Sequence, residues 1–326
     1  MFLYICENRK MNSQEVLLNK LRNNIPKNIS LNEEIARVLD ISYDAAHRRI
    51  SLKSKFSIEE TVALCQYYSL SMDNLFKNKK SLIIQKTKKV ETLNDFKSYF
   101  ETTKEILSEL KPSETTVYYA AKDIPMNYAA AGLLYSKFKF YVWYNLLTKQ
   151  QSINFESFIF EESVFIDHTD LKTFFNSTKR IEIWNDTTIN SSLQQTFYFF
   201  ESGLLNYKNA LHVLQDLNSI IENMEQKCEI DSPEFQMYYN ELLLLNNSVL
   251  FTSKPKSIFF LPYDALGYYA TRDTKTCKEQ REYIENQLLN SKSLNKSGKK
   301  DRKIFFNRIY QKIEFYRNKI ENYVIE

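Results

Sequence analysis

Apolar residues between Met11 and Phe76 recur three and four positions apart, the spacing that places them on one face of an α-helix. Short polar stretches interrupt this pattern four times. The pattern therefore predicts five short helices, within Ser13–Ile25, Ser30–Asp40, Ser42–Ile50, Ser57–Tyr68 and Ser71–Phe76. Two of the predicted helices follow a serine, Ser30 or Ser57, that has a glutamate three residues on, which is the sequence of a capping box. We expect the five helices to form one bundle over residues 11–76.

A lysine-rich segment follows the bundle and indicates a linker over residues 77–92, because "KNKKSLIIQKTKK" contains six lysines. Helical and strand patterns then alternate. Strands are predicted at Thr115–Ala121 and within Glu234–Thr271, where a hairpin is expected to turn at Asn246-Asn247. Helices are predicted near residues 92–110, 129–147, 171–178, 191–205, 208–229, 275–289 and 303–324. The expected fold is mainly α with a minor β part, and residues 93–326 form an α+β domain.

Composition agrees with a globular chain and adds one asymmetry. Apolar residues make up 43% of the 326 residues and charged residues 26%, and there are only 4 glycines, which favours helices over glycine-rich loops. Residues 1–90 contain 16 Lys and Arg against 9 Asp and Glu, a net charge of +7. Residues 91–326 contain 28 against 31, a net charge of −3. A basic head on a slightly acidic body suits a chain that binds DNA through its N-terminal part.

The stretch "ARVLDISYDAAHRRIS" has the order of features that a helix-turn-helix requires. Ala36 is a small residue where a second helix can cross closely, and Leu39 and Ile41 flank a tight turn. Ser42 is placed to cap the next helix, and Ala46 and Ile50 are expected to point inward. This leaves a polar outer face on the second helix, which is typical of a helix that reads base edges in the major groove.

Over Leu17–Phe76 the residues resemble the helix-turn-helix domain of phage-repressor-like (Xre-type) bacterial transcription regulators. The resemblance is carried by Ile35-Ala36, Leu39, Ile41-Ser42 and the closing "SMDNLF" at Ser71–Phe76. It implies a five-helix λ-repressor-like bundle that inserts its third helix into the major groove of double-stranded DNA, usually as a homodimer. Asp40 departs from the glycine that the family prefers in the turn, but aspartate tolerates the same backbone. Arg49 stands where the family often has an apolar residue, so the helix could be rotated by one residue.

The predicted DNA contacts lie on the third helix and just after it. They are Ser42, Tyr43, Asp44, His47, Arg48, Arg49, Lys53 and Lys55. His47 and Arg48 are the candidates for base edges, whereas Lys53 and Lys55 suit phosphates. Arg49 is expected nearer the bundle, and which of the two arginines enters the groove stays open at this point.

The remainder of the chain shows no catalytic constellation, so we expect a regulator that is not an enzyme and needs no cofactor or metal. Asp167, His168 and Asp170 stand together, but a metal site needs more ligands at fixed spacing, and a loop or helix cap explains them equally well. Some repressor-type regulators cleave themselves at an Ala-Gly bond. The Ala131-Gly132 bond of this chain sits in a helical pattern, so we do not expect self-cleavage here. Four scattered cysteines and the absence of a secretion signal favour the cytoplasm. The apolar stretch Ala129–Leu147 contains two lysines, which argues against a membrane span.

Two further features leave alternatives open. Eight aromatic residues could line an effector pocket for a small molecule or simply form core: Tyr118, Tyr119, Tyr141, Trp143, Tyr144, Tyr198, Phe199 and Phe200. The last helix carries an apolar seam that could pair two copies or pack on its own domain: Phe306, Ile309, Ile313, Tyr316, Ile320 and Tyr323. The alternative function is a scaffold or signalling protein whose head binds protein instead of DNA.

Overall fold

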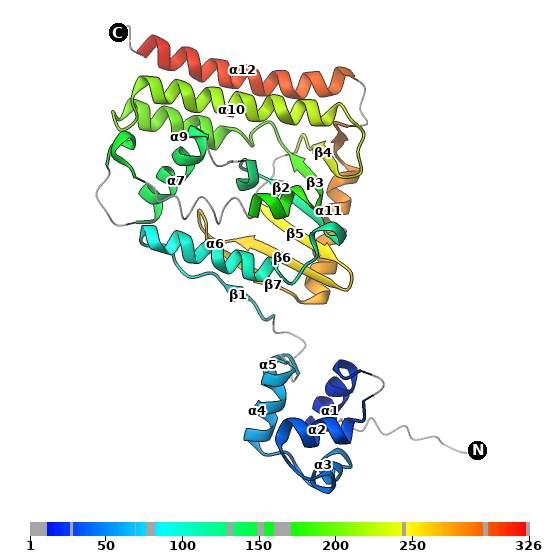
Figure 1. Cartoon of the computed structure of the whole chain (residues 1–326). Coiled ribbons are helices and arrows are strands. Elements are labelled where there is room, and N and C mark those ends of the chain that lie inside the picture. The colour runs from blue at the N-terminus through cyan, green and yellow to red at the C-terminus, as the bar shows by residue number, and fades with distance from the viewer. Residues whose placement is uncertain are drawn as a thin grey trace, which may run out of the picture. The chain divides into compact units, whose positions relative to one another are not determined.

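The computed structural model describes residues 12–26, 29–68, 70–75, 82–128, 133–148, 153–159, 171–242, 246–295 and 299–323. The chain divides into two compact units, Met1–Ile83 and Ile84–Glu326. Each unit has its own hydrophobic core. Helices dominate, and the second unit adds one eight-stranded sheet (Figure 1). The prediction of a mainly helical chain with a smaller β part is therefore confirmed.

The described residues of the N-terminal unit form five helices: α1 (Ser13–Asn24), α2 (Leu31–Leu39), α3 (Tyr43–Ile50), α4 (Ile58–Tyr67) and α5 (Met72–Leu75). The predicted capping box at Ser57 is confirmed, because Ser57 Oγ accepts from Glu60 N at 3.1 Å and Glu60 Oε2 accepts from Ser57 N at 3.0 Å. The box predicted at Ser30 is wrong, since the Ser30 side chain makes no cap hydrogen bond. There the first turn of α2 carries two carboxylates, Glu33 and Glu34, which favour the positive end of the helix dipole.

Burial of one apolar face per helix holds this unit together. Its buried residues are Leu17, Leu18, Leu21 and Ile25 around α1, Ile35 on α2, Ala46 on α3, and Leu64 and Cys65 on α4. Isolated helices of this length are marginal in water, so their stability depends on this shared core.

The backbone at Asp40 supplies a test of the turn between α2 and α3. Asp40 has φ 50° and ψ 49°, in the left-handed region that β-branched residues avoid. We expect Asp40→Val to destabilise the N-terminal unit by about 1–2 kcal/mol, and Asp40→Gly to leave its stability unchanged or slightly higher. Amide hydrogen exchange of α2 and α3 in the full chain measures the difference. Wild-type exchange in the valine variant would contradict a strained turn.

The boundary between the units falls inside the predicted linker 77–92. Residues 77–81 lie outside the described residues. From Gln85 onward the segment belongs to the second unit, because Gln85–Lys86 forms strand β1 and pairs antiparallel with Tyr269 and Ala270. Val90 is buried in the core of the same unit.

The second unit is built on one mixed sheet with the strand order β1-β7-β6-β5-β2-β3-β4-β8. Besides β1, the strands are β2 (Thr116–Ala121), β3 (Lys179–Trp184), β4 (Phe235–Tyr239), β5 (Ser248–Ser253), β6 (Lys256–Pro262), β7 (Tyr268–Thr271) and β8 (Lys292–Ser293). Strands β2, β3 and β4 run parallel to one another, and the remaining pairs are antiparallel. Because side chains alternate along each strand, the sheet presents two different faces to the helices.

Helices cover both faces of the sheet unequally. They are α6 (Leu93–Leu107), α7 (Leu134–Leu147), α9 (Asn190–Glu201), α10 (Tyr207–Cys228), α11 (Thr274–Leu289) and α12 (Lys299–Tyr323). Residues 171–176 are also helical, and short 3-10 helices lie at Pro112–Glu114, Met126–Tyr128 and Phe155–Ser157. Helix α11 packs on one face through Cys277 and Ile284, against Tyr118, Leu250 and neighbouring residues. The other face carries the larger core, to which α6, α7, α9, α10 and α12 contribute (Figure 1).

The hairpin predicted at Asn246-Asn247 is wrong. Residues 243–245, most of its first predicted strand, lie outside the described residues, but both edges of its second strand, β5, are occupied, one by β2 and the other by β6. The observed hairpin joins β5 to β6 through Lys254 and Pro255, and Ser253 pairs with Lys256 on either side of this turn. The prediction at Asn246-Asn247 relied on the residues of the turn alone, whereas the position of a hairpin depends on which strands pair in the sheet. Strand β3 and the short strands β1 and β8 were not predicted.

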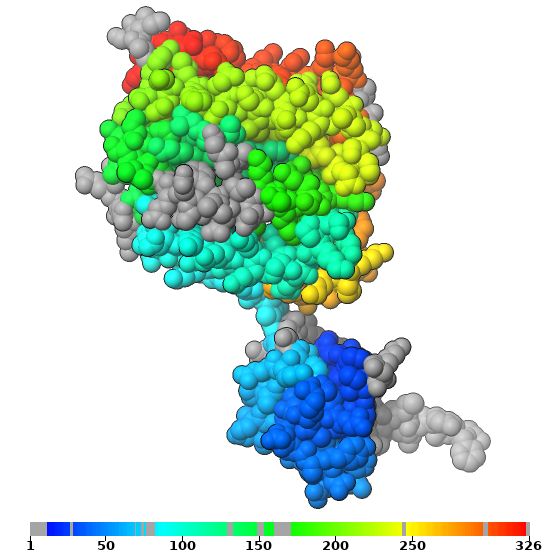
Figure 2. Space-filling model, in the orientation of Figure 1, coloured from blue at the N-terminus to red at the C-terminus, as the bar shows by residue number. Residues whose placement is uncertain are grey.

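Four of the six residues of the apolar seam predicted on the last helix are buried within the second unit, whereas Tyr316 is half-buried and Tyr323 is 48% exposed. Phe306, Ile309, Ile313 and Ile320 are at most 1% exposed and belong to the large core. Helix α12 packs beside α10 and α9 (Figure 1). In Figure 2, α10 forms a continuous yellow-green band next to the red of α12. Of the two alternatives for the seam, packing on its own domain is therefore the one observed.

Candidate nucleic-acid interface

The junction between α2 and α3 is fixed by backbone and cap hydrogen bonds. Ile41 N donates to Ala36 O at 3.0 Å, across the left-handed residue Asp40 that ends α2. Ser42 Oγ accepts from Ala45 N at 3.2 Å, which satisfies a free amide in the first turn of α3. The direction of α3 relative to α2 is therefore set within three residues of the chain.

The inner face of α3 is short and apolar. Ala46 is completely buried in the N-terminal core, and Ile50 packs against the same core from one turn later. The methyl group of Ala46 allows α3 to lie close to α2, whose Ile35 is also completely buried. The rotation of α3 about its axis follows from these contacts, and it decides which polar residues face outward.

The outer face of α3 brings together most of the predicted contact residues. The exposed ones are Ser42, Tyr43, Asp44, His47 and Arg48 on the helix, and Lys53 and Lys55 in the segment that follows. Arg48 has no side-chain partner among the described residues. Tyr43 and His47 both approach Asn32 at the start of α2, since Asn32 Nδ2 lies 3.1 Å from Tyr43 Oη and 3.5 Å from His47 Nδ1. Asn32 is thus a polar member of this surface that the sequence reading did not include.

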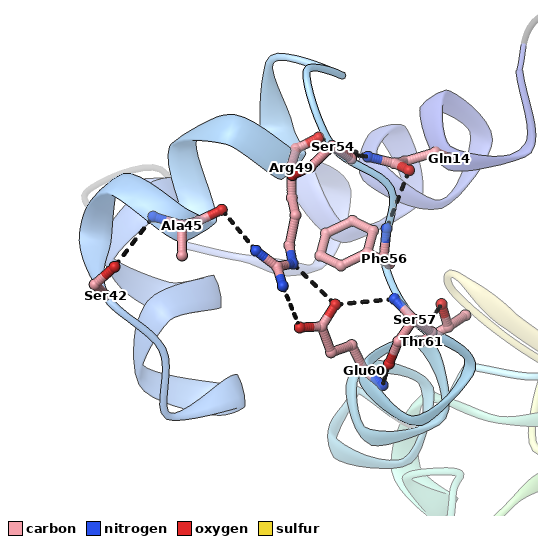
Figure 3. Close-up of polar contacts among 9 residues, drawn as sticks. All are labelled: Gln14, Ser42, Ala45, Arg49, Ser54, Phe56, Ser57, Glu60 and Thr61. Carbon is pink, nitrogen blue, oxygen red and sulfur yellow. Dashed lines mark hydrogen bonds and ion pairs between the residues drawn. The ribbon is translucent and has the colours of Figure 1, made fainter.

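Arg49 is separated from the other predicted contacts. Its guanidinium binds Glu60 of α4 in a bidentate pair, with Nε to Oε2 at 2.9 Å and Nη2 to Oε1 at 2.5 Å (Figure 3). Nη1 also donates to Ala45 O at 3.0 Å. The Arg49 side chain is only 20% exposed, and Glu60 is 18% exposed. Arg49 therefore braces α3 against α4, and Arg48 is the arginine that faces outward.

A glutamine of α1 holds the segment that follows α3. Gln14 Nε2 donates to Arg49 O at 2.7 Å and to Ser54 O at 2.9 Å, and Gln14 Oε1 accepts from Phe56 N at 3.3 Å (Figure 3). The segment between α3 and α4 also contains Leu52 in the left-handed region, with φ 63°. These bonds fix the backbone that carries Lys53 and Lys55. No sequence signal pointed to Gln14, because its partners lie 35 to 42 residues away.

The Arg49–Glu60 pair makes the stability of α3 depend on pH. Hydrogen bonds from Arg49 lower the pKa of Glu60 below its ordinary value of 4.5. Because the folded pKa lies below the unfolded one, the pair stabilises the unit above about pH 4.5, and this contribution is lost as the pH falls through the folded pKa. Glu60→Gln should therefore cost about 1 kcal/mol at pH 7, and the difference from wild type should shrink toward pH 4.

Amide exchange of α3 and α4, corrected for the intrinsic effect of pH, measures this dependence. Lys20→Gln, which removes an exposed charge of α1, is the control and should change little at either pH. A Glu60→Gln effect that is equal at pH 7 and pH 4 would show that charge pairing is not its cause.

No family model, curated protein or solved structure matches the chain. The functional interpretation therefore depends on the residues of this chain alone.

Two other candidate sites from the sequence lie outside the described residues. They are the possible metal ligands Asp167, His168 and Asp170, and the Ala131-Gly132 bond. Within the described residues, no three His, Cys, Asp or Glu side chains gather as a metal site requires. Among those residues there is also no helix with the length and apolar character of a membrane span.

Proposed function

We propose that this chain is a sequence-specific DNA-binding transcription regulator, with α2 and α3 as a helix-turn-helix in a λ-repressor-like bundle. The observation that carries the proposal is that one side of α3 is held in the bundle and the other side is polar and exposed. Ala46, Ile50 and Arg49 fix the helix in the bundle, whereas His47 and Arg48 stand exposed on the opposite side. An exposed arginine that has no side-chain partner among the residues the structure describes, on a short helix held by core contacts, is suited to bind a guanine edge in the major groove.

The neighbouring residues fit supporting roles in the same interface. Tyr43 and Asp44 begin the exposed side of α3, the end from which recognition helices contact base edges. Lys53 and Lys55 follow the helix on a backbone held by Gln14, and they suit phosphate contacts that position the protein. Ser42 acts first as the helix cap, so its contribution to binding would be through the orientation of α3.

A homodimer on a two-fold operator is part of this proposal. One such head spans a short half-site, and two-fold pairing extends the sequence that is read. Most of the α12 seam is buried in the chain's own core, so we expect the dimer contact to lie on another surface.

Selection of bound sequences from a random duplex pool, with the full chain, tests the function. We expect a recovered palindrome, and an affinity that falls steeply between 50 and 200 mM salt as counterions are released, about tenfold or more. Failure to bind any duplex at about 50 mM salt would overturn the proposal. That result would favour a head that binds protein.

A further inference from the structure

The second unit contains a cavity of about 170 Å³ between α6, α7 and the large-core face of the sheet. Tyr99 and Thr103 of α6 line one side, and Tyr119 of β2, Phe251 of β5 and Phe260 of β6 line the other. The volume is below the roughly 300–1,000 Å³ of pockets for drug-sized ligands, but close to the roughly 150 Å³ of a cavity that accepts benzene. The walls therefore suit a small molecule with an apolar ring.

Two tyrosine hydroxyl groups on this cavity lack a hydrogen-bond partner among the described residues. Tyr99 is only 7% exposed, with its ring packed edge-on against Phe100 and Tyr268. The Tyr268 hydroxyl, by contrast, is paired with Thr103 Oγ1 at 2.7 Å. Tyr119 is the second tyrosine without a partner, and burial raises its pKa and that of Tyr99. Both phenols are therefore neutral near pH 7 and able to donate.

Other tyrosine hydroxyl groups of this unit do have hydrogen-bond partners. Tyr135 Oη lies 2.8 Å from Ser192 Oγ, Tyr141 donates to Ile153 O at 2.7 Å, and Tyr128 donates to Glu182 Oε1 at 2.8 Å. Leaving a buried donor unsatisfied is unfavourable. Tyr118, which is 8% exposed and packs on the other face of the sheet, also has no hydrogen-bond partner among the described residues, but it does not line this cavity. An occupant of the cavity would supply the acceptor that the buried Tyr99 and the half-buried Tyr119 lack.

The charges at the cavity cancel. Lys139, whose side chain is 4% exposed, lies 3.1 Å from Asp123 Oδ2 and donates to Gln195 Oε1 at 3.1 Å. Since an ammonium has three donors, one N–H of Lys139 remains for another acceptor. A charged ligand would lose its hydration without gaining a counter-charge. The cavity therefore favours a neutral molecule that accepts hydrogen bonds.

We propose that this cavity binds a small neutral aromatic molecule with an acceptor oxygen, such as an aromatic ketone, which accepts from the Tyr99 and Tyr119 hydroxyl groups. The proposal concerns the second unit alone and does not depend on DNA binding. Of the eight aromatic residues that the sequence suggested for an effector pocket, Tyr119 and Trp143 line this cavity.

Two matched probes test the proposal with the full chain in the absence of DNA. Acetophenone carries a ketone, and α-methylstyrene has the same shape with a methylene group in place of the oxygen. We expect ligand-observed NMR titration to show acetophenone binding about fivefold or more tighter, the effect of one hydrogen bond. Tyr99→Phe should reduce that preference severalfold and leave the affinity for α-methylstyrene unchanged.

A second variant tests the location. Ala265 lies on the exposed rim of the cavity, so Ala265→Trp should weaken both probes without unfolding the chain, as checked by its melting temperature. If neither probe binds, the proposal is wrong and water is the occupant of the cavity. Equal affinity for the two probes, or an unchanged preference in both Tyr99→Phe and Tyr119→Phe, would overturn the assigned chemistry. Failure of the duplex selection would leave all these outcomes unaffected.

Discussion

Replacing Arg48 with alanine should lower the affinity for the selected operator by about 1–3 kcal/mol, or roughly 5- to 150-fold. The reason is that Arg48 is the exposed arginine of α3 and has no partner among the described residues, so its guanidinium is free to donate two bonds to one base. The fold should be unaffected, because the side chain supports nothing in the bundle. Fluorescence anisotropy with the selected duplex at fixed salt measures the loss.

The matched control is Lys20→Ala, which removes one exposed positive charge from α1 instead of α3. It should change the affinity little. A base contact by Arg48 would reduce operator binding more than binding to an unrelated duplex, whereas a phosphate contact would reduce both equally. Unchanged operator affinity in the Arg48→Ala variant, or the same loss in both variants, would refute the assignment of Arg48.

The helices of the N-terminal unit were predictable because their determinants are local. Apolar spacing, the Ser57 cap and an aspartate that tolerates the left-handed turn all lie within a few residues of the elements they define. The separation of Arg48 from Arg49 was not predictable in the same way. It depends on Glu60, which is 11 residues further along and in another helix. A one-residue uncertainty in rotation therefore needed tertiary contacts to resolve it.

Strand β3 shows why the sheet was harder to predict. Its sequence, "KRIEIW", places Arg180 and Glu182 at alternate positions, which a period-two pattern would assign to the solvent face. Both are instead buried on the large-core side, at 7% and 1% exposure. Parallel neighbours on both sides bury the strand, and the two charges are accepted because they lie 3.7 Å apart. Pairing between distant strands, which decides such cases, has no local signal.

The same buried pair gives the largest stability effect that we expect. Glu182 Oε1 accepts from the Tyr128 hydroxyl at 2.8 Å and Oε2 from Trp184 Nε1 at 2.9 Å, and burial raises its pKa above 4.5 despite Arg180. Arg180→Met would leave the carboxylate buried without its cation. We expect this to destabilise the second unit by about 3–5 kcal/mol at pH 8.

The sign of the pH dependence follows from the direction of the Glu182 shift. A carboxyl whose folded pKa lies above its unfolded pKa costs stability as the pH rises through the folded value, and loss of Arg180 would raise that value further. The difference between Arg180→Met and wild type should therefore be smaller at pH 5.5 than at pH 8. Urea unfolding followed by tryptophan fluorescence measures it, since Trp143 and Trp184 both lie in the second unit.

Two further variants separate charge from packing. Lys179→Met removes the adjacent, half-exposed lysine, whose Nζ lies 3.9 Å from Glu234, and should cost less than about 1 kcal/mol at either pH. Adding Glu182→Gln to Arg180→Met should abolish the extra loss at high pH, because the amide carries no charge, its oxygen can accept from Trp184 Nε1, and its NH2 can donate to the Tyr128 hydroxyl. If the double variant keeps the full pH dependence of Arg180→Met, the unpaired carboxylate is not the cause and the cost lies in the packing of the Arg180 side chain against Phe235.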